Sequence, residues 1–151
     1  MFSDVDKYFM KLAIAEAYKS FEEGEVPVGA VVVRDDEVIS YGRNIKGKNK
    51  NALLHAEMVA IHKSVKMLDD WRLNECTLYV TCEPCVMCAG AILHCRIKKV
   101  IFGAFEPKFG GVVSNLRVFD TPFFNHKVRY EFGLFSEEIS KMMKNFFKQF
   151  R

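Results

Sequence analysis

The sequence predicts an α/β protein of three layers, with helices on both faces of a central mixed sheet of about five strands. Two observations predict this class. Segments with helical spacing of apolar residues alternate with short, β-branched apolar segments, which is typical of a sheet covered by helices. The length of 151 residues, half of them apolar, suits one domain with a substantial core. We therefore expect a single domain over residues 1–151.

The first third of the chain predicts a helix followed by a hairpin. Apolar residues recur at helical spacing over residues 4–23, and Gly24 supplies a stop. Residues 26–33 predict a buried strand, and residues 38–41 predict its hairpin partner after an aspartate-rich turn. The lysine- and asparagine-rich residues 44–54 predict a loop.

The rest of the chain predicts further helices and strands in alternation. In chain order they are helix 55–67, strand 77–81, helix 85–94, strand 99–102, strand 128–132 and helix 137–150. Pro84 lies where a helix can begin, because its ring already fixes a helical φ. Residues 106–121 predict irregular structure around a Gly-Gly pair. The last helix has an apolar side formed by Ile139, Met142, Met143, Phe146, Phe147 and Phe150.

Charge is mild overall but unevenly distributed. The formal net charge is +3, which does not by itself require a polyanionic partner. Residues 43–50 hold four basic side chains and no acid, and residues 141–151 hold four more, again without an acid. Such stretches can follow a phosphate backbone. A solvated loop and a solvated helix face explain each stretch equally well when it is taken alone.

The sequence gives no sign of export or of a membrane. The first residues lack a basic head followed by an apolar core, and no apolar run approaches the roughly 20 residues that span a bilayer. Five cysteines, an odd number with three of them between residues 82 and 88, do not resemble a secreted disulfide framework. We therefore expect a cytoplasmic protein.

The most informative pattern has two halves, each at the predicted start of a helix. The first is His55-Ala56-Glu57, and the second is Pro84-Cys85-Val86-Met87-Cys88. One imidazole and two thiolates suit zinc, and a site with only three protein ligands leaves the fourth position for water. The unpaired N–H groups of a helix N-terminus also stabilise thiolates. We expect His55, Cys85 and Cys88 to bind one Zn²⁺.

Glu57 is the expected catalytic residue. A carboxylate two residues from the histidine need not bind the metal, and it can move protons to and from the water. In the deamination of a base, Glu57 would protonate a ring nitrogen and then pass a second proton to the departing ammonia. One carboxylate can act as acid and base in turn, because each step restores the other form.

Other interpretations of the cysteines compete with the catalytic one. A Cys-x-x-Cys pair also occurs in structural zinc sites and in redox dithiols. Cys82 is a possible fourth ligand, and the segment from Cys82 to Cys85 is itself a Cys-x-x-Cys that follows a strand. A redox protein would leave His55, Glu57 and Cys88 unexplained. We therefore favour the catalytic site and expect Cys82 to be a buried bystander.

The pattern H-x-E…P-C-x-x-C is the signature of zinc nucleobase deaminases, and the chain resembles the bacterial tRNA adenosine deaminases (TadA family) of the cytidine/deoxycytidylate deaminase superfamily. The resemblance covers nearly the whole chain. Its segments are Glu25-Val-Pro-Val-Gly-Ala30, Trp71-Arg-Leu73, Glu83-Pro-Cys-Val-Met-Cys-Ala-Gly90, Phe102-Gly-Ala104, Pro107-Lys108, Asn125-His126 and Phe146-Phe147-Lys148. The superfamily alone would share only the zinc segments.

The resemblance implies a cytidine-deaminase-like fold and adenosine-to-inosine conversion at the wobble position of a tRNA anticodon. It implies a homodimer with one zinc per subunit, acting on an anticodon stem-loop and not on DNA or a membrane. His55, Cys85 and Cys88 match the zinc ligands, and Glu57 matches the proton shuttle. Six positions match or adjoin segments expected to contact the substrate: Asn44, which matches the base-edge reader, Pro84, Glu106, Lys108, Phe146 and Phe147.

The sequence also departs from that family. Cys82 stands where the family often has leucine, Leu53-Leu54 replace smaller residues before the histidine, and Glu106 replaces aspartate. Residues 111–116 differ as well. These changes leave the expected chemistry intact and affect the expected RNA contacts. A zinc deaminase of a free base or nucleotide, such as guanine or cytosine, is an alternative, because such enzymes share the zinc signature. A catalytically inert zinc-bearing subunit is a further alternative, against which the presence of Glu57 argues.

Overall fold

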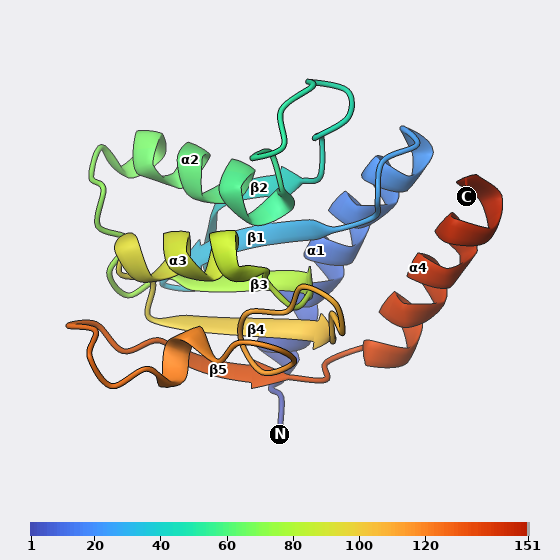
Figure 1. The fold of residues 1–151 in the computed structure, drawn as a ribbon. Helices are drawn as coiled ribbons and strands as arrows, with labels where there is room; N and C mark the ends of the chain where they lie inside the picture. Colours follow the sequence, from blue (N-terminus) through green and yellow to red (C-terminus); the bar gives the residue numbers. More distant parts are fainter. Residues whose placement is uncertain (151) are drawn as a thin grey trace.

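Five strands form one central sheet in the computed structural model, which describes residues 1–150 (Figure 1). The strands are β1 (Gly29–Arg34), β2 (Glu37–Arg43), β3 (Thr77–Cys82), β4 (Lys99–Ala104) and β5 (Arg129–Phe132). Their order across the sheet is β2-β1-β3-β4-β5. Strand β1 is antiparallel to both of its neighbours, whereas β3, β4 and β5 run parallel. The predicted mixed sheet of about five strands is therefore confirmed.

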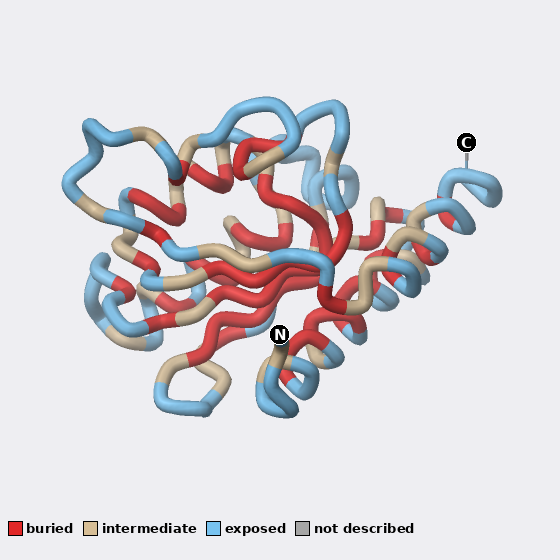
Figure 2. Tube along the Cα trace, turned by 90° about the horizontal axis from the view of Figure 1, so that it is seen from below, coloured by how far each residue is buried: buried red, intermediate tan, exposed pale blue. Residues whose placement is uncertain are grey.

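Helices cover both faces of this sheet, which confirms the three-layer prediction. They are α1 (Asp4–Glu22), α2 (Ala56–Leu68), α3 (Val86–His94) and α4 (Ser136–Phe150), with a 3-10 turn, η1, at Val118–Asp120. One buried cluster joins α2 and α3 to the sheet, and a second joins α1 and α4 to its other face. Figure 2 shows the buried strands between these layers and the exposed loops around them.

The first helix begins where a side chain satisfies its free N–H groups. The Ser3 hydroxyl accepts a hydrogen bond from the Asp6 amide at 3.0 Å, and the Asp6 carboxylate accepts one from the Ser3 amide at 3.1 Å. This reciprocal capping box fixes the entry of the chain into α1. A second Asp6 oxygen accepts a hydrogen bond from the Tyr79 hydroxyl at 2.7 Å, so the cap is also tied to β3.

The start of α2 lies unusually close to the sheet. A Cβ atom on Gly42 would come within 2.2 Å of the Ala56 carbonyl oxygen and 2.7 Å of the Ala60 amide. Only glycine allows this approach, because any side chain would push the helix away from β2. The close packing holds the N-terminal turn of α2 against the sheet, and that turn carries half of the predicted zinc motif.

The parallel strands β3 and β4 end at the same edge of the sheet. Cys82 pairs with Ala104 at that edge, and the segment after β3 leads directly into α3. Loops that follow parallel strands commonly carry binding residues, because the rigid sheet positions them together. The two halves of the zinc motif therefore meet beside the carboxyl ends of β3 and β4.

Several predicted boundaries differ from the structure. The strand predicted at 26–33 begins only at Gly29, since the preceding residues include Pro27, which has no N–H to donate to a strand. Cys85 is the N-cap of α3, and Pro84 lies one residue before it. The region predicted to be irregular, 106–121, contains η1. None of the helices within residues 1–150 is long and apolar enough to cross a membrane.

Candidate active site

Three metal-binding side chains converge where α2 and α3 begin. His55 is the N-cap of α2, Cys85 is the N-cap of α3, and Cys88 lies in the first turn of α3. The His55 Nδ1 atom lies 3.7 Å from the Cys85 sulfur and 3.6 Å from the Cys88 sulfur. All three donor atoms lie within 4.8 Å of one another, so they can grip a single ion.

The spacing of these atoms fits zinc. Ordinary zinc–sulfur and zinc–nitrogen bonds at a tetrahedral angle place a nitrogen and a sulfur ligand about 3.6 Å apart. The observed separations of 3.7 and 3.6 Å match this value. The cluster among residues 1–150 has three members, which is the number typical of a catalytic zinc site with one open position.

The two sulfurs lie in different environments. A hydrogen bond from the Cys88 thiol is the main cause that lowers the pKa of Cys85 to about 4, and His55 adds to the effect. The same hydrogen bond, together with burial, raises the pKa of Cys88. Cys88 is fully buried whereas Cys85 is half-buried.

Cys82 stays outside the metal cluster. Its side chain is buried at the end of β3 and lines a cavity beside the cluster, but it is not among the three clustered donors. Burial raises the pKa of its thiol to about 12, so the thiol stays protonated at neutral pH. A protonated, buried thiol behaves as a small apolar side chain. This arrangement agrees with the prediction that Cys82 is a bystander.

We predict that Cys82→Ser retains zinc. The substitution exchanges a buried thiol for a hydroxyl of similar shape and touches none of the three ligands, so metal analysis of the purified variant should give the wild-type content. The buried hydroxyl should lower stability by about 1–3 kcal/mol, measurable by chemical denaturation. Loss of the metal would show that Cys82 is a ligand.

Glu57 lies beside the metal cluster without belonging to it. It is 3% exposed, occupies the first turn of α2, and lines the cavity. Burial is the main cause that raises the pKa of Glu57 to about 7, and the nearby His55 opposes the rise. The group therefore has the position that the sequence predicted for a proton shuttle.

A cavity of about 420 Å³ opens above these residues. Its walls include five parts of the chain: the segment 26–28, the loop after β2, the start of α2, the segment 82–86 from the end of β3 to the start of α3, and the loop after β4. Met143 of α4 closes one side. This volume falls within the range of ordinary small-molecule sites.

Asn44 lines this cavity and carries an acceptor that has no hydrogen-bond partner. The residue is 7% exposed, and its side-chain nitrogen donates a hydrogen bond to the Val26 carbonyl at 3.3 Å. Its side-chain oxygen is buried without a hydrogen-bond partner. A buried acceptor without a partner costs free energy, which a bound ligand with an N–H or O–H group can recover.

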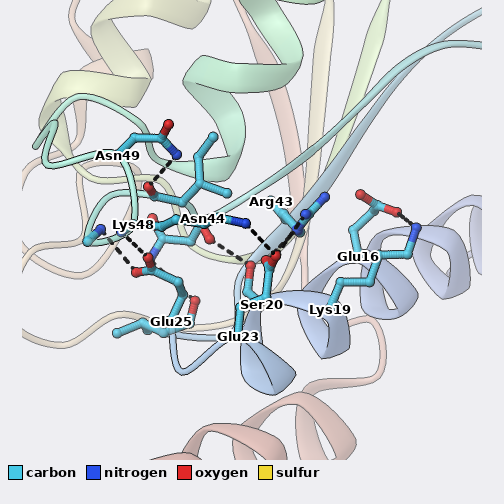
Figure 3. A network of polar contacts seen from close by, with 12 residues as sticks. Glu16, Lys19, Ser20, Glu23, Glu25, Arg43, Asn44, Lys48 and Asn49 are labelled. Carbon is cyan, nitrogen blue, oxygen red and sulfur yellow. Dashed lines mark hydrogen bonds and ion pairs between the residues drawn. The ribbon is translucent and has the colours of Figure 1, made fainter.

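A network of polar contacts holds the loop that carries Asn44 (Figure 3). The Ser20 hydroxyl donates to the Asn44 carbonyl at 2.8 Å, and Arg43 forms two hydrogen bonds with the Glu23 carboxylate. The buried carboxylate of Glu25 accepts hydrogen bonds from the Gly47 and Lys48 amides. A second hollow of about 540 Å³ lies beside this network and shares Val26, Asn44 and Lys46 with the cavity.

The structure places the predicted substrate-binding residues unequally. Asn44 and Glu106 line the cavity, whereas Lys108 is exposed outside it. Pro84 is buried behind the cavity wall. Phe146 is 1% exposed and packs against Phe21 and Phe150, so its side chain cannot contact RNA directly.

The other member of the phenylalanine pair is more exposed than Phe146. Phe147 is 41% exposed on the last helix. The expectation that at least one of the two is buried is therefore confirmed by Phe146. Sequence reasoning missed several lining residues, among them Val26, Val28, Lys46, Glu83, Val86, Phe109 and Met143.

Known proteins resemble this chain along almost its whole length. Residues 3–104 match the family model of the cytidine and deoxycytidylate deaminase zinc-binding region. The tRNA-specific adenosine deaminase of Aquifex aeolicus is 46% identical over 145 residues, which cover 96% of this chain and 95% of the relative. The enzyme of the same name from Bacillus subtilis is 43% identical over 146 residues, covering 97% and 91%.

Solved structures of related proteins also resemble this chain over most of its length. A structure from a study of A-to-I editing by tRNA:A34 deaminases at the wobble position of transfer RNA superposes with a TM-score of 0.86 at 39% identity, covering 89% of this chain and 98% of that one. Guanine deaminase from Nitrosomonas europaea superposes with a TM-score of 0.80 at 18% identity, covering 93% and 83%. The second likeness shows the fold alone.

Proposed function

The chain belongs to the cytidine and deoxycytidylate deaminase family, within it to the tRNA-specific adenosine deaminases, and we propose that it converts adenosine to inosine at the wobble position of a tRNA anticodon. The proposal is carried by one observation: a cluster of three zinc-fitting donors, of which His55 and Cys85 line the cavity, lies beside the buried Glu57 carboxylate, which lines the same cavity without belonging to the cluster. The family resemblance supplies the substrate class. We also propose that one deaminase domain accounts for the chain.

The residues around the cavity divide the chemistry between them. His55, Cys85 and Cys88 would hold zinc, which lowers the pKa of a coordinated water so that an attacking oxygen is available at neutral pH. Glu57 takes a proton from the water and delivers protons to the ring nitrogen and to the leaving amine. A bond from oxygen to C6 of adenine forms, the bond from C6 to the exocyclic nitrogen breaks, and ammonia leaves.

Asn44 is proposed to hold the nucleoside in the correct orientation. Its unpaired oxygen accepts a hydrogen bond from an N–H or O–H of the substrate, and its nitrogen stays fixed by Val26. We predict that Asn44→Ala raises KM by roughly tenfold, because one buried hydrogen bond contributes about 1–2 kcal/mol to binding. Steady-state kinetics on an anticodon stem-loop measure the change. An unchanged KM with an unchanged kcat would remove Asn44 from substrate binding.

The rim of the cavity supports an RNA substrate. Lys46 lines the cavity, and the exposed side chains of Lys108 and Phe147 offer a phosphate contact and a surface for base stacking. An anticodon loop presents splayed, single-stranded bases of the kind that such side chains recognise. We also propose that the enzyme acts in the cytoplasm, where its five free cysteines would stay reduced.

We propose that the active form is a homodimer. Val86 and Phe109 line the cavity and are 53% and 71% exposed, and Leu116, whose amide donates to the Gly110 carbonyl next to Phe109, is 54% exposed. A second copy of the chain that covers them would complete the RNA site. Sedimentation analysis should give twice the mass of the chain, and charged substitutions at Val86 and Leu116 should lower it. A monomer with full activity on RNA would contradict this proposal.

Incubation of purified protein with tRNA tests the proposed activity directly. Inosine is read as guanosine during sequencing, so an adenosine-to-guanosine change confined to the wobble position is the expected result. Free adenosine, guanine and cytosine serve as comparison substrates. Turnover of a free base without any change in tRNA would overturn the proposal in favour of a nucleobase deaminase.

A further inference from the structure

The carboxylate of Glu83 is the most heavily hydrogen-bonded side chain in the cavity wall, and it is not one of the three clustered metal donors. It is 3% exposed and follows β3 directly. One oxygen accepts hydrogen bonds from the Glu106 amide and the Ser114 hydroxyl, at 3.1 and 2.5 Å. The other accepts from the amides of Val112, Val113 and Ser114, at 3.1, 2.8 and 2.9 Å.

These five donors all belong to one segment, residues 106–114, which follows β4. The segment wraps so tightly around the carboxylate that a Cβ atom on Gly110 would lie 2.5 Å from it. Such converging backbone N–H groups form a concave site for an anion, and here the chain fills that site with its own side chain. Hydrogen bonds to an ionised acceptor are also stronger than neutral ones.

The same segment is joined to the metal-binding segment. The Gly111 amide donates to the Pro84 carbonyl at 2.8 Å, and Gly110 forms an isolated β-bridge with Cys85. The Glu83 amide in turn donates to the Ala104 carbonyl at 2.8 Å. Residues 83–85 and 104–114 therefore form one hydrogen-bonded unit, with the Glu83 carboxylate at its centre.

This unit connects the zinc ligands to a wall of the cavity. Cys85 provides a metal-binding sulfur, and Glu106 and Phe109 of the wrapped segment line the cavity. Phe109 is 71% exposed, so few contacts of its own hold it in place. The position of this wall relative to the metal therefore depends on the carboxylate beneath it.

We propose that Glu83 is a positioning residue that fixes the substrate-binding wall at 106–114 relative to the zinc ligands. The inference rests on the proposed deaminase function and deepens it. Glu83 is not a metal donor, and both of its carboxylate oxygens are held by residues 106–114, so it acts through Glu106 and Phe109 of that segment. Loss of its carboxylate leaves the ligands and Glu57 in place but lets the wall move.

Glu83→Gln tests this role with little change in shape. The carboxamide puts an NH₂ group where an oxygen accepted hydrogen bonds, so at least two donors of the segment lose their acceptor. We expect KM for an anticodon stem-loop to rise about tenfold or more, in line with the cost of a displaced binding group. The turnover number and the zinc content should stay near wild type. Ser114→Ala, which removes one of the five donors, should give a smaller rise.

Two readouts do not depend on activity. In hydrogen exchange, the amides of Val112, Val113 and Ser114 should exchange faster in Glu83→Gln, whereas amides of β3 and β4 should stay protected. Asp6→Asn is the matched control: it also replaces a hydrogen-bonded carboxylate by an amide, but at the cap of α1, away from the cavity. It should lower stability without raising KM.

The outcomes separate the inference from the proposed function. If wild-type protein does not deaminate tRNA, the proposed function fails, but the exchange data still report on the wall. An unchanged KM in Glu83→Gln, or an equal rise in Asp6→Asn, would overturn the positioning role. If Glu83→Gln does not fold, Ser114→Ala decides, because wild-type KM and wild-type exchange in that variant would also overturn it.

Discussion

Replacing Glu57 by glutamine should lower kcat for tRNA deamination by about 10⁴-fold, the upper end of the range for loss of a general acid–base group. The carboxamide fills the same space but cannot take up and release protons in turn. Each proton transfer in the proposed reaction passes through this one side chain, so no other group within the cavity replaces it. Single-turnover assays with excess enzyme measure the chemical step directly.

The loss of activity in Glu57→Gln must occur while the zinc site stays intact. Glu57 is not among the three clustered donors, so zinc content should equal that of wild type. Glu16→Gln is a suitable control, because Glu16 is also buried, at 6% exposed, but lies on α1 and pairs with Lys19 outside the cavity. Activity of Glu57→Gln within a few-fold of wild type would eliminate this residue as the shuttle.

The order of the secondary structure could be predicted because local patterns determine it. The apolar spacing along α1 and α2 and the β-branched runs of β1 and β3 each reflect a face that the element buries. Boundaries were less predictable. The start of β1 at Gly29 depends on pairing with β2 and β3, which are distant contacts that periodicity does not report.

The metal ligands could be predicted for a similar reason. His55 and the two cysteines sit at helix starts, and their spacing within each half is fixed by the local chain. The joining of the halves depends on the sheet, which sets α2 beside α3. The sequence therefore predicts which atoms bind, and the fold supplies the separations of 3.6 and 3.7 Å.

The walls of the cavity could not be predicted in the same way. Phe109 lies in an irregular segment, and Met143 comes from the last helix, so only the tertiary structure brings them to Glu57. Phe146 shows the converse error. Its place in a basic, aromatic terminus predicted an RNA contact, but the helical period turns it toward Phe21 and exposes Phe147.

Cys88→Ser should remove both zinc and activity, whereas the same exchange at Cys82 should remove neither. The two thiols are both buried, six positions apart, and serine matches the shape of each. Comparing the two variants therefore separates the effect of metal binding from the effect of packing. A hydroxyl is a poor zinc ligand, so Cys88→Ser leaves two donors. Metal analysis should show that the zinc content per chain falls from stoichiometric to substoichiometric, and inosine formation should disappear.

Stability should separate the two variants as well. A metal that binds only the folded chain stabilises it by about 4 kcal/mol when free zinc exceeds the dissociation constant a thousandfold. Cys88→Ser forfeits this contribution in addition to the cost of a buried hydroxyl, so its unfolding midpoint should lie well below that of Cys82→Ser. A chelator should lower the unfolding midpoint of the wild-type protein toward that of Cys88→Ser, and it should leave the midpoint of Cys88→Ser unchanged. If both serine variants kept zinc, or if the chelator left wild-type stability and turnover intact, the three-ligand site could not be the catalytic centre.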